Sequence, residues 1–259
     1  MAVCEFHLSA NNALGKMTSL MAIVPDDAPG PCAVLYLLHG LSDDHTSWTR
    51  RTSIERHIGG LPLIVVMPNG ERGFYTNSQA DPQAAYETNL VHDIVGFVDR
   101  TFRTIPTREG RVIAGLSMGG YGAAKLALKY PDIFCAGVSH SGAVAFAHRL
   151  MHQEWTGFDW LVGLFGDNPT GGPDDIFALA DRSDPATRPA LRIDCGTEDF
   201  LLDQNRALHA HLDALGYLHE YAEHPSGHGW DYWDTHIQDT LQFFTQILNM
   251  QQENCIAER

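Results

Sequence analysis

One serine of this chain lies among glycines. Residues 111–122 read RVIAGLSMGGYG, so Ser117 stands at the centre of a Gly-x-Ser-x-Gly pattern, between a β-branched run and an alanine-rich run. In this pattern the serine occupies a sharp strand-to-helix turn, where larger neighbouring side chains would collide with the backbone. The helix start also directs amides toward developing negative charge. The pattern is typical of a nucleophilic serine, and its alternative is a glycine-rich helix start that only packs tightly.

A serine hydroxyl needs a base to become a nucleophile, and the base needs a group that orients it. In chains with this motif the expected order is serine, acid, histidine. The apolar segment 190–196 runs directly into the letters TED, which places acids just past the end of a strand. We expect Asp199 to be the orienting carboxylate, with Glu198 and Asp203 as alternatives.

The base that this order requires is a histidine downstream of the acid. His228 lies between two glycines in the loop PSGHGW, before the last helical pattern of the chain. It has neither bulky neighbours nor a place on an amphipathic stripe. Ser117, Asp199 and His228 are therefore the predicted catalytic residues, and an essential His224 or His236 would contradict the assignment of this loop.

Acyl transfer also needs two amides that stabilise an oxyanion. One follows the nucleophile directly and belongs to Met118. The other should come from the loop after an earlier strand, where the chain reads LLHGLSDDHTSW and offers the amide of Leu41. Gly40 allows the backbone to approach closely, and we expect His39 to be a structural hydrogen-bonding residue rather than a second base.

The sequence indicates neither a metal site nor a bound cofactor. The segment HEYAEH at 219–224 has its histidines five positions apart, whereas the metalloprotease helix motif places them four apart. In a strand these two histidines would point to opposite faces. The five cysteines are scattered singly, without a Cys-x-x-Cys pair, which disfavours a disulfide framework and a zinc cage.

Alternating strand and helix patterns must position these residues. Continuous apolar runs that end in glycine or proline are typical of parallel strands covered on both faces. Helical stripes lie at 91–102, ending before Pro106, at 208–215 with Gly216 as C-cap, and at 233–248. The alternation predicts a three-layer α/β fold. The expected strands are 4–9, 16–25, 32–40, 61–70, 111–115, 134–140, 190–196 and 219–224.

The length of 259 residues is consistent with one domain, residues 1–259, in which residues 143–188 form a cap-like insertion. This insertion holds Trp155, Phe158, Trp160 and Phe165 among glycines, prolines and aspartates. We take Trp160 and Phe165 as candidate substrate-binding residues that narrow the acyl site, since ligand sites are commonly apolar and aromatic. Burial in a satellite core is the equal alternative.

The charge and the N-terminus limit the partners and the location. With 17 basic and 32 acidic residues, the net charge of −15 opposes binding to nucleic acid or to an anionic membrane surface. The N-terminal segment lacks the basic and apolar regions of a signal peptide, and no apolar run has the length of a membrane span. We therefore expect a soluble cytoplasmic protein.

Five segments together resemble a known family. The segments LYLLHGLSDDHTSW, YTNSQ, AGLSMGGYGAAKLAL, CGTEDFL and SGHGWDYWD are similar to the esterase D group of α/β-hydrolases, especially its tributyrin-esterase-like branch, over nearly the whole chain. The resemblance implies the α/β-hydrolase fold, with a mostly parallel central sheet flanked by helices. In that branch the elbow serine, the aspartate of the G-x-x-D-F-L segment and the histidine before the final helix form the triad, which match Ser117, Asp199 and His228.

The resemblance implies a serine carboxylesterase with an acyl-serine intermediate, a small-molecule ester as substrate and no cofactor, and it is compatible with a homo-oligomer. We expect short acyl groups, from acetyl to butyryl. The group also contains S-formylglutathione hydrolases, feruloyl and sugar-acetyl esterases and mycolyl transferases. The formylglutathione branch has histidines where this chain has Leu116 and Tyr121, which weakens the thioesterase alternative. A non-catalytic binding module would usually have lost a triad member.

Overall fold

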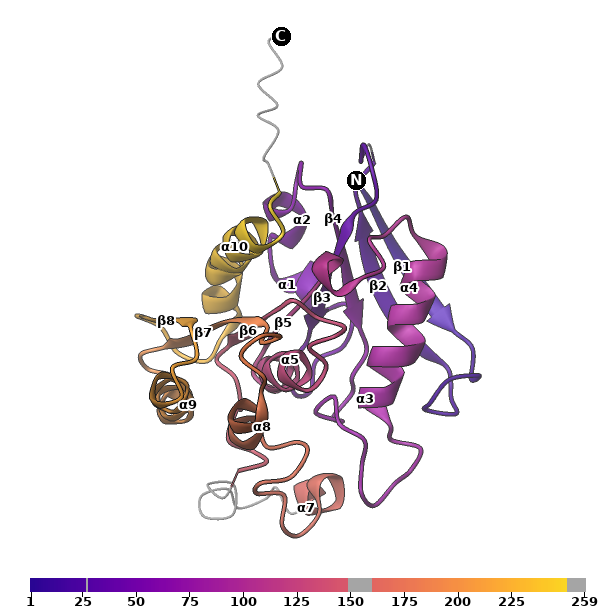
Figure 1. Cartoon of the computed structure of the whole chain (residues 1–259). Coiled ribbons are helices and arrows are strands. Elements are labelled where there is room, and N and C mark those ends of the chain that lie inside the picture. The colour runs from indigo at the N-terminus through magenta and orange to yellow at the C-terminus, as the bar shows by residue number, and fades with distance from the viewer. Residues whose placement is uncertain (27, 149–159, 251–259) are drawn as a thin grey trace.

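The central feature of the fold is one eight-stranded sheet (Figure 1). The computed structural model describes residues 1–26, 28–148 and 160–250. The strands are Ala2–Leu8 (β1), Thr18–Val24 (β2), Ala33–Leu38 (β3), Leu63–Pro68 (β4), Arg111–Leu116 (β5), Ala136–His140 (β6), Ala190–Gly196 (β7) and His219–His224 (β8). The α-helices are Ser47–Arg51 (α1), Ile54–His57 (α2), Tyr86–Thr88 (α3), Val95–Thr101 (α4), Met118–Lys129 (α5), Trp160–Phe165 (α7), Ile176–Arg182 (α8), Leu202–Ala214 (α9) and Trp230–Ile247 (α10).

The strand order across the sheet is β1-β2-β4-β3-β5-β6-β7-β8. From β4 to β8 all neighbouring strands are parallel, while β2 is antiparallel to both β1 and β4. Every residue of β3, β4, β5 and β6 is buried, as the continuous apolar runs predicted. The mostly parallel sheet expected from the sequence is therefore confirmed, with an antiparallel hairpin added at its N-terminal edge.

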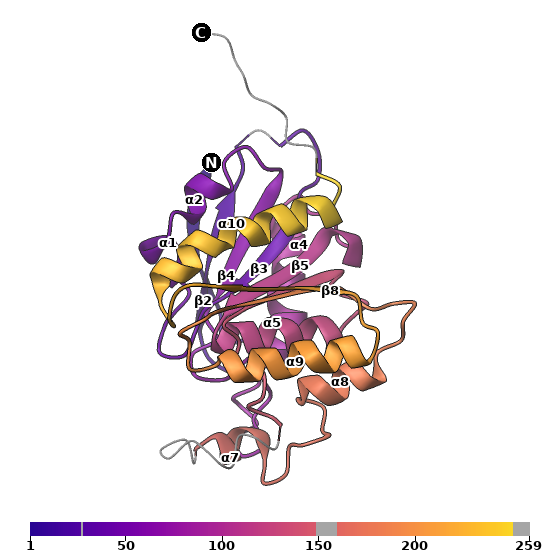
Figure 2. The same ribbon diagram turned by 90° about the vertical axis from the view of Figure 1, so that its left-hand side faces the viewer.

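Helices cover both faces of this sheet (Figure 2). Successive side chains of a strand point to opposite faces, so Tyr36 and Leu38 of β3 pack with α4, α5, α8 and α9. Leu35 and Leu37 of the same strand pack with α1, α2 and α10 on the other side. The two separate apolar cores confirm the predicted three-layer α/β architecture.

The long helical patterns are confirmed with local differences. The stripe at 91–102 forms α4 together with a π-helical turn, Asn89–Ile94, that follows α3, and α4 ends at Thr101. Gly216 follows α9 with a φ of +61°, and its amide donates to the carbonyl of Asp213, as expected of a C-cap. No helix in the described part of the chain has the length and the apolar character needed to cross a lipid bilayer.

The segment predicted as a cap-like insertion, residues 143–188, contributes α7 and α8. Helix α8 packs against α5 and α9, and its Ile176, Phe177 and Ala180 belong to the apolar core on that face of the sheet. Most of α8 is therefore part of the helical layer. Helix α7 lies at the outer end of the molecule in both views (Figures 1 and 2). Trp155 and Phe158 lie outside the described residues.

Candidate active site

The turn between β5 and α5 presents Ser117. The residue has a φ of 52° and a ψ of −113°, a left-handed conformation that costs energy for a residue with a side chain. Its amide donates to the carbonyl of His140 on β6 at 2.9 Å, and its carbonyl accepts from Tyr121 and Ala143. These backbone contacts hold the serine in a conformation that places its side chain at the carboxyl ends of the parallel strands.

The glycines around the serine allow three segments to come together. A Cβ on Gly115 would lie 2.5 Å from the carbonyl carbon of Gly119, and one on Gly119 would lie 2.5 Å from the carbonyl oxygen of Leu38. These distances are far shorter than carbon contacts tolerate. Glycine is therefore required for the close approach of β3, β5 and the start of α5, which explains why the pattern surrounds one hydroxyl.

The structure brings together the three side chains that the sequence selected. The Nε2 atom of His228 lies 3.0 Å from Oγ of Ser117, although the two residues are 111 positions apart. The Nδ1 atom of the same ring lies 2.7 Å from Oδ2 of Asp199, 29 positions away. Both distances are those of hydrogen bonds. Since the carboxylate can only accept, Nδ1 carries the hydrogen and Nε2 is left to accept from the serine hydroxyl.

Asp199 is held so that it can fulfil this orienting role. Its side chain has no exposed surface, and its Oδ1 accepts from the amide of Leu201 at 2.8 Å. Burial by itself raises the pKa of Asp199, but the hydrogen bond and the charge of His228, together with the Leu201 amide, outweigh it and hold the pKa below its ordinary value. The carboxylate is therefore ionised at neutral pH.

The ring of His228 is flanked by two aromatic side chains. Phe200 lies 4.5 Å away, measured between ring centroids, and Trp233 lies 5.0 Å away in an edge-to-face arrangement. The histidine side chain keeps 17% of its surface exposed. The alternatives His224 and His236 stack on each other instead, with ring centroids 3.9 Å apart.

The loop after β3 lies directly beside the serine. A Cβ on Gly40 would lie 3.6 Å from the Cβ of Ser117. His39 is buried, accepts at Nε2 from the amide of Gly70 and donates from Nδ1 to the carbonyl of Gly40 at 2.8 Å, which confirms its structural role. Burial lowers the pKa of His39, so the ring stays neutral.

The bond from His39 also orients the next amide. The C=O and N–H of a trans peptide point in opposite directions, so fixing the Gly40 carbonyl fixes the direction of the Leu41 N–H. Within the described part of the chain, neither this amide nor that of Met118 has a hydrogen-bond acceptor. Both amides are thus free to receive a ligand oxygen.

The structure places Trp160 and Phe165 in an aromatic cluster. Phe165 is buried against Phe74 and Tyr121, with centroids 5.8 Å apart in both pairs. Trp160 lies 6.0 Å from Phe74. Trp160 also lines a cavity of about 600 Å³, whose lining residues do not include Ser117.

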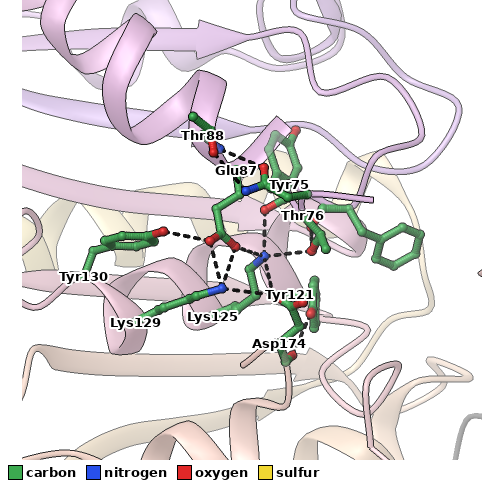
Figure 3. A network of polar contacts seen from close by, with 11 residues as sticks. Tyr75, Thr76, Glu87, Thr88, Tyr121, Lys125, Lys129, Tyr130 and Asp174 are labelled. Atoms are coloured by element: carbon green, nitrogen blue, oxygen red, sulfur yellow. Dashed lines mark hydrogen bonds and ion pairs between the residues drawn. The ribbon is translucent and has the colours of Figure 1, made fainter. Parts of the chain in front are cut away.

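A buried lysine that the sequence analysis missed anchors helix α5 (Figure 3). The side chain of Lys125 has no exposed surface, and its Nζ donates at 2.7 Å to the carbonyl of Tyr75, to Oγ1 of Thr76 and to the carboxylate of Glu87. Asp174 lies 3.3 Å away. The nucleophile helix is thereby tied to the loop after β4, to α3 and to the segment before α8.

Glu87 is the centre of negative charge in this network. Burial alone would raise its pKa, but the charge and hydrogen bond of Lys125, followed by those of Lys129, lower the pKa to about 2. Tyr130 also donates to Glu87 at 2.7 Å. The sequence signal was two lysines at i and i+4 in an otherwise apolar helix, a position that charged residues occupy only when they are paired.

Strand β8 places its two histidines on opposite faces, as predicted. His219 lies against His209 and Asp213 of α9, whereas His224 lies against His236 and Asp239 of α10. In each group, one nitrogen or oxygen atom from every member lies within 4.8 Å of the others. Both groups contain residue types that can bind a metal ion.

Comparison with known proteins places the chain in a family. Residues 11–244 match the family model Esterase. The chain is 28% identical over 254 residues to an acetyl esterase of Caldicellulosiruptor saccharolyticus, covering 90% of this chain and 95% of that protein. It is 30% identical over 248 residues to the esterase Rv1288 of Mycobacterium tuberculosis (strain H37Rv), covering 84% of this chain and 54% of that longer protein.

Two solved structures from Staphylococcus aureus are similar over almost their full length. The fluorophosphonate-binding serine hydrolase FphF superposes with a TM-score of 0.83 at 30% identity, covering 96% of this chain and 98% of that one. The S-formylglutathione hydrolase FrmB superposes with a TM-score of 0.81 at 29% identity, covering 96% and 99%. The chain therefore belongs to the Esterase family and is a carboxylic ester hydrolase with the α/β-hydrolase fold, in agreement with the esterase D resemblance.

Proposed function

We propose that this protein is a serine carboxylesterase that hydrolyses small esters of short acyl groups, from acetyl to butyryl, through an acyl enzyme on Ser117. The observation that carries the proposal is the continuous contact from the Ser117 hydroxyl through His228 to the ionised Asp199, at 3.0 and 2.7 Å. Activation of a hydroxyl by an oriented imidazole is the arrangement that acyl transfer requires.

In the first half-reaction, Oγ of Ser117 attacks the ester carbonyl carbon while Nε2 of His228 accepts the hydroxyl proton. The tetrahedral intermediate then breaks its bond to the alcohol oxygen, which leaves with the proton from Nε2. In the second half-reaction, water gives a proton to Nε2 and attacks the acyl-serine. The second tetrahedral intermediate then collapses and releases the carboxylic acid, while Nε2 of His228 returns the proton to Oγ. Asp199 keeps the ring in one tautomer throughout.

The amides of Leu41 and Met118 are the proposed oxyanion donors. The position of Gly40 against Ser117 and the orientation that His39 gives to the following peptide support this role for Leu41. Met118 is the first residue of α5, so its amide has no acceptor within the helix. Removing one such donor typically reduces turnover on the order of 10²–10³-fold.

The preference for short acyl groups rests on the aromatic cluster near the start of α5. Tyr121 is one helical turn beyond Ser117, and Phe165 and Phe74 pack on it. We expect large rings at this position to leave little room for a long acyl chain. The name of the acetyl esterase relative is consistent with this preference.

Hydrolysis of the thioester S-formylglutathione is the second candidate. It is favoured by the similarity to FrmB over almost the whole chain. Both candidates use the same acyl enzyme and differ in the leaving group, a thiol of glutathione or an alcohol. The choice between them therefore depends on the surface that receives the leaving group.

A substrate panel tests the proposal. We expect kcat/KM for p-nitrophenyl acetate and butyrate to exceed that for the octanoate by about tenfold or more, because extra methylenes no longer fit. The Ser117→Ala variant gives the background rate for each compound. A higher kcat/KM for S-formylglutathione than for any oxygen ester would replace the esterase by the thioesterase, and equal rates across the acyl series would remove the chain-length preference.

The role of Trp160 is tested on the same series with Trp160→Ala. If the ring bounds the acyl site, the variant should accept the octanoate better relative to the acetate. If the ring only packs against Phe74, the variant should melt at a lower temperature with an unchanged acyl profile. Thermal unfolding of both proteins separates the two outcomes.

A further inference from the structure

Two histidines face each other between helix α9 and the edge strand β8. The Nδ1 atom of His209 lies 2.8 Å from Nε2 of His219. The two rings are inclined at 62°, with centroids 5.0 Å apart, so the lone pairs of these nitrogens lie in different planes and can converge. Asp213 lies one helical turn beyond His209, and its Oδ2 is 3.5 Å from Nε2 of that histidine.

The outward nitrogen of each ring is oriented by an oxygen atom. The Nδ1 atom of His219 lies 2.7 Å from the carbonyl oxygen of Tyr217. A carbonyl only accepts, so this nitrogen carries the hydrogen and Nε2 of His219 directs a lone pair at His209. On the other ring, Nε2 of His209 faces the carboxylate of Asp213.

With both rings neutral, this arrangement leaves no hydrogen between His209 and Asp213. One hydrogen can lie between the two facing nitrogens, and if both rings are neutral it belongs to Nδ1 of His209. The Nε2 atom of His209 then turns a lone pair toward the carboxylate of Asp213. A dication between the facing nitrogens removes this conflict, because the hydrogen of His209 moves from Nδ1 to Nε2 and is donated to Asp213. No proton is gained or lost.

We propose that His209 and His219 form a site for a divalent transition-metal ion such as Zn²⁺, bound through Nδ1 and Nε2 respectively, with water at the remaining positions. Metal-binding histidines usually donate their other nitrogen to a carbonyl or a carboxylate, as Tyr217 and Asp213 allow here. Zn–N bonds of about 2.0–2.1 Å in a tetrahedron place two nitrogens ~3.3 Å apart, so the rings need to separate by about 0.5 Å.

The surroundings of His209 are partly open to solvent. The His209 side chain is 34% exposed and that of Asp213 is 62% exposed, so water can reach the metal. The ring of His209 stacks on Tyr221, with centroids 4.1 Å apart and planes only 6° from parallel, which limits its rotation. The neighbouring cation Arg206 is already bound by both oxygens of Glu223, at 2.8 and 2.7 Å.

The other histidine group, on the opposite face of β8, is unsuited to an ion. The rings of His224 and His236 are stacked within 15° of parallel, so their lone pairs lie in parallel planes and do not meet. His236 already pairs with Asp239 at 2.8 Å, and Arg192 lies 3.8 Å from the same carboxylate. This group therefore serves as a matched control for non-specific binding to surface histidines.

The ion would join two elements that carry the candidate active site. Helix α9 begins just after Asp199, and β8 ends just before the loop of His228. The sequence predicted no metal site, on the ground that the two histidines of β8 point to opposite faces. The proposed site instead combines His219 of β8 with His209 of α9. An ion at this place stabilises the native state by linkage, without contact with Ser117.

Titration calorimetry of tag-free, EDTA-treated full-length protein with Zn²⁺ tests the site. We expect one high-affinity equivalent per chain in the wild type and in His236→Ala, and its loss in His209→Ala and His219→Gln. Asp213→Asn should weaken binding by about tenfold. Ser117→Ala should bind like the wild type, which separates this site from the esterase chemistry.

Thermal unfolding provides a second readout. Zn²⁺ should raise the melting temperature of the wild type and of His236→Ala, but not that of His209→Ala or His219→Gln. Both histidines are partly exposed, and the melting temperatures without metal show whether each variant is folded. The inference is overturned if the wild type binds no Zn²⁺, or if the His209 and His219 variants bind it as tightly as the wild type does.

Discussion

The trio of hydroxyl, imidazole and carboxylate at the strand ends has a counterpart in the core of the protein. At the strand ends, Ser117 contacts His228, which contacts Asp199. On the face of the sheet covered by α10, Oγ1 of Thr240 lies 2.7 Å from Nε2 of His140. The Nδ1 atom of His140 lies 2.8 Å from Oδ1 of Asp194. The atoms and distances are nearly the same in the two trios.

The two trios differ in burial and in the remaining contacts. Thr240, His140 and Asp194 have no exposed surface, and Tyr232 also donates to Asp194 at 2.9 Å. Thr240 lies inside a helix, where no substrate can reach its hydroxyl. A hydrogen-bonded trio is therefore not sufficient for catalysis. Ser117 differs in that it lies on a strained, glycine-flanked turn and is partly exposed, as the proposed function requires.

The largest expected difference between the two trios is the effect on kcat of removing the hydroxyl. Ser117→Ala should lower kcat for p-nitrophenyl acetate by about 10⁵-fold or more, because the nucleophile is lost. Thr240→Val removes the corresponding hydroxyl from the buried trio and should retain most of the turnover. Steady-state kinetics with a check of thermal unfolding measures both, and a large loss of kcat in a folded Thr240→Val would contradict the distinction.

Substituting the two carboxylates should affect activity in one trio and stability in the other. Asp199→Asn should reduce kcat by roughly 10⁴-fold, since the ring of His228 is no longer held in the useful tautomer. Asp194→Asn should instead lower the free energy of unfolding by roughly 3 kcal/mol, because buried hydrogen bonds to a charged group are lost. Kinetics and urea unfolding of both variants test this. A large loss of kcat in Asp194→Asn, with a loss of stability alone in Asp199→Asn, would contradict the roles assigned to the two trios.

Acid should lower the stability that both trios contribute, and we expect this effect to be the smallest of the three. Burial raises the pKa of Asp194 and of Asp199, but their histidine partners outweigh it, so both pKa values lie below the ordinary 3.8. The stability that these carboxylates contribute is therefore present above pH 3.8 and is lost as the pH falls through their lower pKa values in the folded protein. Urea unfolding at a series of acidic pH values should show a shallower decline in each Asn variant than in the wild type. Parallel curves would exclude this contribution.

Most of the fold could be predicted because its signals are local. The apolar runs that became β3 and β4 show burial on both faces, and the stripe that became α10 shows one apolar side. Short helices such as α1 and α7 were missed because they span too few residues to display a period. The buried Lys125 was missed because a charge in a helix normally indicates a solvated face, and its partners come from distant segments.

The site could be predicted in part for the same reason. The elbow glycines are short-range signals of backbone that must approach closely, whereas a Cβ on Gly227 or Gly229 beside His228 would meet nothing closer than 3.9 Å. Choosing Asp199 over Glu198 and Asp203 relied on the family resemblance as well as on the strand end. The buried Thr240, His140 and Asp194 gave no such signal, because their types and spacing resemble those of many core and surface positions.

The sequence by itself determined where the chain turns, which segments are buried and which hydroxyl sits on a strained turn, because each of these depends on a few adjacent residues. Only the tertiary structure decided which histidine meets which acid and hydroxyl. A hydrogen bond acts over about 3 Å, whereas its partners at the candidate site are 111 and 29 residues apart. The strand order β5-β6-β7-β8 and the packing of α10 determine their meeting.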